Sequence, residues 1–107
     1  MPRLDDDGSR ITLDLHGVDV DRAVEMAGAA IIEAARHGRT SLRIVHGAST
    51  AERGHERTIR GELRDAVQHG DFDRHVTTHL FDDGSMLLGL APSPRPADGR
   101  VRLGDVW

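Results

Sequence analysis

The chain has 107 residues, of which 37% are hydrophobic and 30% are charged, so it can form one domain with a core and is too short for two. It contains no cysteine, which excludes disulfides, thiol catalysis and zinc–thiolate sites. No segment approaches the roughly 20 apolar residues of a membrane span, and the first seven residues lack the apolar core of a secretory signal. We therefore expect a cytoplasmic location and no contact with membranes.

The net charge of −4 is distributed unevenly along the chain. Residues 1–35 carry a balance of −5, residues 36–64 a balance of +4, and residues 65–107 a balance of −3. All 14 basic residues are arginines, whose guanidinium groups suit bidentate contacts to phosphate. The central block therefore predicts either a phosphate-binding surface or a solvated helix face with ordinary ion pairs.

The first half of the sequence predicts a strand, a helix and a second strand. Residues 1–9 are acidic and predict a disordered N-terminus. Apolar residues alternate over 10–16, which indicates a strand, and then recur at helical spacing over 19–37 behind the N-cap residue Asp19. The apolar run at 41–46 indicates another strand, so the two strands are expected to be parallel neighbours.

The second half predicts a helix and a hairpin. Helical periodicity returns, and two alternating segments then flank a DDGS turn. Prolines at 92–96 end the regular structure, and residues 100–107 predict either a short added strand with Trp107 anchored or a loose tail. The elements are expected in this order: loop 47–55, helix 56–69, strand 74–81, turn 82–85 and strand 86–90.

The order βαβαββ predicts an α/β fold, a two-layer sandwich with a four-stranded mixed sheet. The expected organisation is a disordered acidic N-terminus over residues 1–9, one domain over residues 10–91, and a C-terminal tail with proline and arginine over residues 92–107.

Two short strings of sequence each consist of the end of an apolar strand followed by histidine and glycine. They are LDLHG at 13–17 and IVHG at 44–47. Because parallel neighbours end at the same edge of a sheet, Asp14, His16 and His46 are expected to meet there. Asp14 and His16 share one strand face, so Asp14 is expected to orient His16 by a hydrogen bond. Imidazoles exchange protons near neutral pH, and we therefore predict these three residues to be catalytic.

These strings, together with GELRDAV at 61–67, resemble the Smr (small MutS-related) domain family over roughly residues 10–91. The resemblance implies a fold similar to the C-terminal domain of translation initiation factor three. It also implies nucleic-acid binding and nicking of RNA or DNA phosphodiesters, with ribosomes or repair proteins as associated partners. By position, Asp14 and His16 match the first family motif, and His46 and Gly47 match the second.

The second motif departs from the family pattern His/Thr-Gly-x-Gly, because Ser49 replaces the second glycine. This change weakens the expectation of close backbone approach to a phosphate, and the Ser49 hydroxyl is a candidate replacement. The residues expected to contact nucleic acid are Gly47, Ser49, Arg43, Arg57, Arg60 and Arg64.

Two mechanisms are open for such a site. In RNA, the 2′-hydroxyl can attack the phosphodiester with one histidine as base and another as acid, without a metal. In DNA, water must be activated, which usually requires a divalent ion such as Mg²⁺ or Mn²⁺. One aspartate and two histidines are a poor ligand set for Mg²⁺, so no residue is assigned to a metal and RNA is favoured.

Two other functions are consistent with the same residues. One is a non-catalytic module that binds nucleic acid or a protein and has lost activity through its altered second motif. The other is an unrelated small α/β protein that binds a metal through Asp14, His16 and His46.

Overall fold

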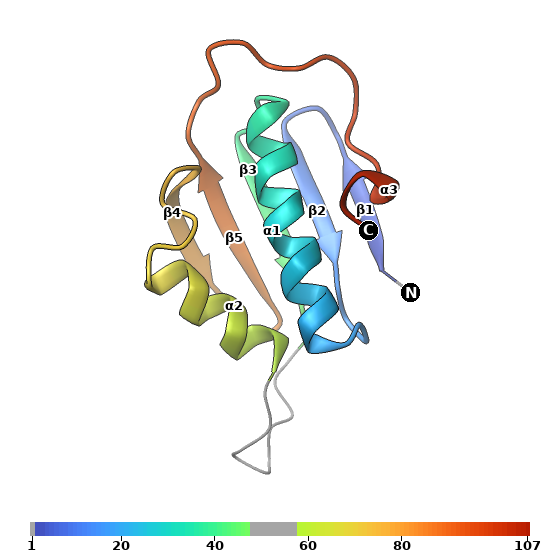
Figure 1. Cartoon of the computed structure of the whole chain (residues 1–107), viewed down its shortest axis with the longest axis vertical. Helices are drawn as coiled ribbons and strands as arrows, with labels where there is room; N and C mark the ends of the chain where they lie inside the picture. Colours follow the sequence, from blue (N-terminus) through green and yellow to red (C-terminus); the bar gives the residue numbers. More distant parts are fainter. Residues whose placement is uncertain (1, 48–57) are drawn as a thin grey trace.

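One mixed sheet of five strands organises the chain, in a computed structural model that describes residues 2–47 and 58–107. The two long helices lie on one face of the sheet (Figure 1). In spatial order the strands are β1 (Arg3–Asp6), β2 (Arg10–Asp14), β3 (Ser41–Val45), β5 (Ser85–Leu90) and β4 (Val76–Phe81), and the helices are α1 (Val20–Arg36), α2 (Ile59–Gln68) and α3 (Leu103–Val106).

The central β2–α1–β3 unit confirms the predicted parallel pair. β2 and β3 run parallel, with Thr12 opposite Arg43. The Asp19 side chain accepts a hydrogen bond from the backbone of Asp21 and thereby caps α1. The helix ends where Gly38 adopts a positive φ of 73°, a conformation that glycine tolerates best.

The core lies between this sheet and the two long helices. Alternate residues of the central strands point toward the helices and are fully buried, whereas α1 contributes a face of small alanines that lets its backbone approach the sheet closely. Among the core residues are Ile11, Leu13, Ile44, Leu88, Ala23, Ala27, Ala30 and Ala34.

The prediction of a disordered segment over residues 1–9 is wrong, and so is the four-strand count. Residues 3–6 form β1, which pairs antiparallel with β2 and adds a fifth strand. Composition favoured disorder because three aspartates follow one another. In the structure Leu4 packs against the core, Asp7 accepts backbone hydrogen bonds within the β1–β2 turn, and an arginine neutralises Asp6.

The C-terminal segment is neither the added strand nor the loose tail that the sequence left open. It returns along the molecule and ends in α3, which contacts α1 and β1 (Figure 1). Val101 and Val106 are buried, and the guanidinium of Arg22 lies 5.1 Å from the ring centroid of Trp107. Burial of these apolar side chains stabilises the packed position of the segment, although prolines interrupt regular structure upstream.

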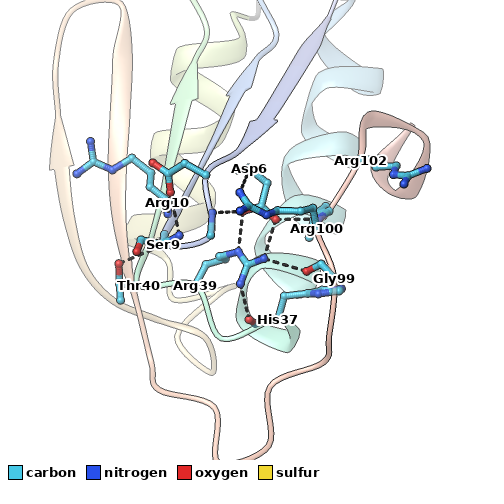
Figure 2. A network of polar contacts seen from close by, with 12 residues as sticks. Asp6, Ser9, Arg10, His37, Arg39, Thr40, Gly99, Arg100 and Arg102 are labelled. Carbon is cyan, nitrogen blue, oxygen red and sulfur yellow. Dashed lines mark hydrogen bonds and ion pairs between the residues drawn. The ribbon is translucent and has the colours of Figure 1, made fainter.

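A polar cluster fastens the C-terminal segment to β1, and we call it the Asp6 clamp: Asp6, Arg39, Gly99, Arg100 and Val101 (Figure 2). Arg39 forms two hydrogen bonds with the Asp6 carboxylate, at 2.7 and 2.9 Å. The backbone N–H of Val101 donates to the same carboxylate at 2.8 Å, and Arg100 donates to the backbone carbonyl of Asp6. The clamp therefore joins the two ends of the described chain.

None of the helices formed by residues 2–47 and 58–107 covers the second face of the sheet (Figure 1). By strand register, Asp5, Thr12, Arg43 and Leu87 lie side by side across this open face. Within the described part of the chain, no helix is both long and apolar enough to cross a membrane.

Candidate nucleic-acid interface

The candidate site lies at the edge where β2 and β3 end. The start of α1, the start of α2 and the β4–β5 turn gather at the same end of the molecule (Figure 1). The strand ends are held together because the backbone N–H of Leu15 donates to the carbonyl of Val45 at 2.7 Å. Ends of parallel strands beside helix N-termini are the usual position of ligand sites in α/β sheets.

The first string forms a tight turn that exposes His16. Gly17 adopts a positive φ of 82°, and the N–H of Val18 donates to the carbonyl of Leu15 at 3.0 Å. Asp14 Oδ1 accepts the backbone N–H of His16 at 3.0 Å. We expected Asp14 to orient the imidazole of His16, but its hydrogen bond is made to the backbone of that residue. Asp14 therefore stabilises the turn, and the His16 side chain faces solvent.

The second string packs against the β4–β5 turn. Backbone N–H groups of His46 and Gly47 both donate to the carbonyl of Gly84 at 3.0 Å. Gly47 has a φ of 83°, and a Cβ built on it would lie 3.8 Å from Cδ2 of His16. The structure therefore brings the two strings together at Gly47 and His16.

His46 differs from His16 because it is buried, with 6% of its surface exposed. Its Nδ1 lies 2.8 Å from the carbonyl oxygen of Gly47, so Nδ1 carries the proton and donates. Its Nε2 is buried and has no hydrogen-bond partner among the described residues. Burial lowers the pKa of His46, and the nearby charges of Arg64 and Arg60 lower it further, so the ring is neutral at pH 7.

Two predicted arginines of α2 lie beside this histidine. Arg60 forms an ion pair with Asp83 at 2.9 Å, in which the Asp83 side chain is largely exposed. Arg64 donates to the backbone carbonyl of Asp82 at 2.8 Å, and its guanidinium lies 4.9 Å from the ring centroid of Phe81. The β4–β5 turn therefore fixes both arginines at the candidate site.

The other predicted phosphate contacts are distributed differently. Arg43 lies in the middle of β3 on the open face, where it borders a shallow hollow with Arg10 and Leu80, and so does not join the arginines of α2. Ser49 and Arg57 lie outside the described residues.

Part of the site was not predicted from the sequence. The DDGS segment was recognised as a turn, but its contacts with His46, Arg60 and Arg64 depend on the pairing of β3 with β5. That pairing joins strands separated by a helix and a further strand. The opposite charges of the acidic turn and the arginine-rich helix were the sequence signal that could have indicated these contacts.

Residues 2–47 and 58–107 contain no group of three or more histidine, aspartate or glutamate side chains placed to hold a metal ion. Asp14 and His16 meet through a backbone hydrogen bond, and His46 directs Nδ1 to a carbonyl. The predicted trio therefore does not fit a divalent metal in this arrangement.

Comparisons with known proteins identify the family and support the fold. The family model of the Smr domain matches residues 13–79, which is more than half of the chain. The chain belongs to the Smr domain family. Among solved structures, this Smr domain is similar to the Smr domain of Thermus thermophilus MutS2, with a TM-score of 0.62 and 25% sequence identity over 76% of this chain and 98% of that chain. No curated protein matches the sequence significantly.

The buried His46 is expected to titrate below its ordinary pKa of 6.5. Since the unfolded chain then binds a proton more readily, the contribution of His46 to stability is complete above pH 6.5 and decreases as the pH falls toward the folded-state pKa. NMR titration of the His46 Cε1 proton measures this pKa, and the spectrum of His46→Gln assigns the signal. A midpoint at or above 6.5 would contradict the neutral buried ring.

Proposed function

We propose that this Smr domain binds nucleic acid at the β2–β3 edge and cleaves RNA phosphodiesters there. The observation that carries the proposal is the position of the exposed His16 ring beside Gly47, which brings both family motifs together at the edge where Arg60 and Arg64 lie near His46. An exposed imidazole at an edge that also carries guanidinium groups suits phosphoryl chemistry, which needs proton transfer and stabilisation of negative charge.

In this proposal His16 is the catalytic residue, because its side chain is the exposed imidazole of the motif pair. The His16 ring takes the proton of a ribose 2′-hydroxyl, and the resulting oxygen attacks the adjacent phosphorus. The bond from phosphorus to the 5′ oxygen breaks, and water protonates the leaving oxygen. The products are a 2′,3′-cyclic phosphate and a 5′-hydroxyl end.

Asp14 and His46 act as positioning residues in this scheme. Asp14 holds the backbone of His16, and His46 holds the carbonyl of Gly47 through its Nδ1 proton. The burial of His46 separates it from direct contact with a substrate. This revises the expectation that both histidines exchange protons with the nucleic acid.

Arg60 and Arg64 supply the positive charge for phosphate. The Arg60–Asp83 ion pair is exposed on its acidic side, so water and phosphate can compete with it. Arg64 is held more firmly, by Asp82 and the Phe81 ring, and presents a fixed charge. Cleavage of DNA through a divalent ion is less well supported, since the described residues form no ligand cluster.

One observation favours a second function, binding without cleavage. Cleavage with one histidine as base and another as acid needs two exposed histidines, whereas a module that only binds nucleic acid does not. Because His46 is buried, the site meets the needs of binding more fully than those of two-histidine catalysis. In that case the two arginines of α2 bind the phosphates, and His16 adds a hydrogen bond.

End analysis after incubation with RNA and DNA, with and without EDTA, distinguishes these functions. The proposal predicts RNA products with 5′-hydroxyl and cyclic phosphate ends in the presence of EDTA. A 5′-phosphate product that disappears with EDTA would support a metal-dependent route. Binding without any product would identify the non-catalytic module.

Salt dependence tests the arginine contacts separately. Arg60→Ala is expected to weaken binding of single-stranded RNA and to reduce the slope of log affinity against log salt by about 0.7, the value for one phosphate contact. Fluorescence anisotropy at several salt concentrations measures both quantities. The control is Arg95→Ala, which removes an exposed charge from the proline-rich C-terminal segment. Equal slopes for the two variants would show that Arg60 contacts no phosphate.

A further inference from the structure

A cavity of about 570 Å³ lies next to the candidate site and has no role in the scheme above. It opens beside β1, β2 and α3, and its volume falls in the range of small-molecule pockets. Its wall includes Asp14, the carboxylate of the first family motif. The lining residues that bear on its chemistry are Arg3, Asp5, Thr12, Asp14, Val45 and Leu103.

The described structure shows no pairing between two charged residues of this cavity, Arg3 and Asp14. Arg3 and Asp14 are directly opposite in the pairing of β1 with β2, so their side chains start close together on one face. Among the described residues, no ion pair or hydrogen bond joins their side chains. Asp14 Oδ1 accepts the backbone of His16, whereas Oδ2 has no partner there. The carboxylate of Asp14, an acceptor, and the guanidinium of Arg3, a donor, therefore lie on one face without a hydrogen bond between them.

The composition of the wall excludes phosphate as the group that enters. Asp5 and Asp14 outnumber Arg3, and carboxylates repel a phosphate. Val45 and Leu103 supply apolar surface for a flat, uncharged ring. A ring with a donor and an acceptor on one edge complements a carboxylate and a guanidinium that lie side by side.

Two parts of the cavity come from outside the family match at residues 13–79. Arg3 and Asp5 belong to β1, and Leu103 belongs to α3. The Asp6 clamp fixes these parts to each other, because Asp6 of β1 binds Arg39 and the backbone of Val101 (Figure 2). The cavity is thus formed before any ligand arrives, which reduces the entropic cost of binding.

We propose that this cavity binds one unpaired nucleobase with an exocyclic amino group, next to the phosphate at His16. The inference rests on the proposed function, since the sugar–phosphate backbone must already lie at the β2–β3 edge. Asp14 Oδ2 accepts the amino N–H, and Arg3 donates to the neighbouring ring acceptor. Uracil is disfavoured because its only donor on that edge lies between two carbonyl oxygens, which the carboxylates repel. The substrate is therefore single-stranded at this position.

Homopolymeric oligonucleotides test the preference. By fluorescence anisotropy, oligocytidylate is expected to bind about tenfold more tightly than oligouridylate of equal length, the effect of one charge-assisted hydrogen bond. Thr12→Trp fills the cavity and is expected to reduce the affinity for oligocytidylate to that for oligouridylate. Leu80→Trp is the matched control, since Leu80 lies on the same open face outside the cavity and is 64% exposed. It should keep the tenfold preference.

A second measurement needs no substitution. In NMR titrations of the unmodified chain, cytidine monophosphate is expected to shift the amide signals of Thr12, Val45 and Leu103 at lower concentration than uridine monophosphate, and to leave Leu80 unchanged. If a glycine–arginine–glycine peptide shifts these signals and the nucleotides do not, the cavity accepts a cationic protein segment and the proposal is wrong.

The outcomes separate this inference from the proposed function. Equal affinity for both oligonucleotides overturns the base pocket and leaves nucleic-acid binding in place. Failure to bind either oligonucleotide overturns both proposals. A tenfold preference that Thr12→Trp removes and Leu80→Trp retains supports both.

Discussion

His16→Ala is expected to slow RNA cleavage by at least about 100-fold, the lower limit for loss of a positioned acid or base. The effect is chemical because the His16 ring is exposed and the turn around it is held by backbone hydrogen bonds. The fold should therefore persist, with an unchanged thermal midpoint. Single-turnover rates on a labelled RNA, read together with circular dichroism, measure both quantities.

The matched control is His69→Ala, at the far end of α2 from the candidate site. His69 is also exposed, and its ring contacts the carbonyl of Asp65. Its loss should change the cleavage rate less than twofold. If His16→Ala cleaves as fast as the unmodified domain, the assignment of His16 is wrong, and a rate loss equal to that of His69→Ala leads to the same conclusion.

Arg39→Ala is expected to reduce the free energy of unfolding by about 3 kcal/mol, the effect of leaving a buried charge without its partner. The side chain of Asp6 is 1% exposed and that of Arg39 is 10% exposed, so the pair is largely removed from water and Asp6 loses its charged partner in a buried position. Urea unfolding measures the change. Arg36→Ala is the control, because the Arg36–Glu33 ion pair has a similar distance of 2.9 Å but lies at the surface, where the loss should be below about 1 kcal/mol.

The same clamp makes stability depend on pH at the acidic end. Although burial raises the pKa of Asp6, hydrogen bonds from Arg39 and from backbone amides outweigh it and lower the pKa from 3.8 to about 2. The contribution of Asp6, about 2 kcal/mol, is therefore complete above pH 4 and is lost as the pH falls through 2. Asp6→Asn should flatten this part of the pH profile. An unchanged profile in that variant would contradict the clamp.

The central elements could be predicted from the sequence because their signals are local. Alternation identified β2, an apolar run identified β3, and Asp19 and Gly38 marked the ends of α1. The family resemblance rested on two short strings and the GELRDAV segment, and the family match confirms it. These features depend on periodicity and capping, which act over a few residues.

The peripheral elements could not be predicted because long-range contacts form them. β1 carries charges that composition associates with disorder, and it is ordered by an arginine more than thirty residues away. The burial of His46 depends on a turn contributed by the β4–β5 hairpin. The sequence placed both histidines at one edge, but their unequal exposure follows from strand pairing.

The Asp6 clamp also has a consequence for the order in which the molecule is completed during synthesis. The carboxylate of Asp6 cannot accept the hydrogen bond from the amide of Val101 until Val101 has been synthesised, 95 residues later. Until then β1 lacks one of its two main attachments, and the outer edge of β2 is protected only weakly against pairing with another chain. The segment around Val101 thus secures β1 only long after β1 itself has been synthesised.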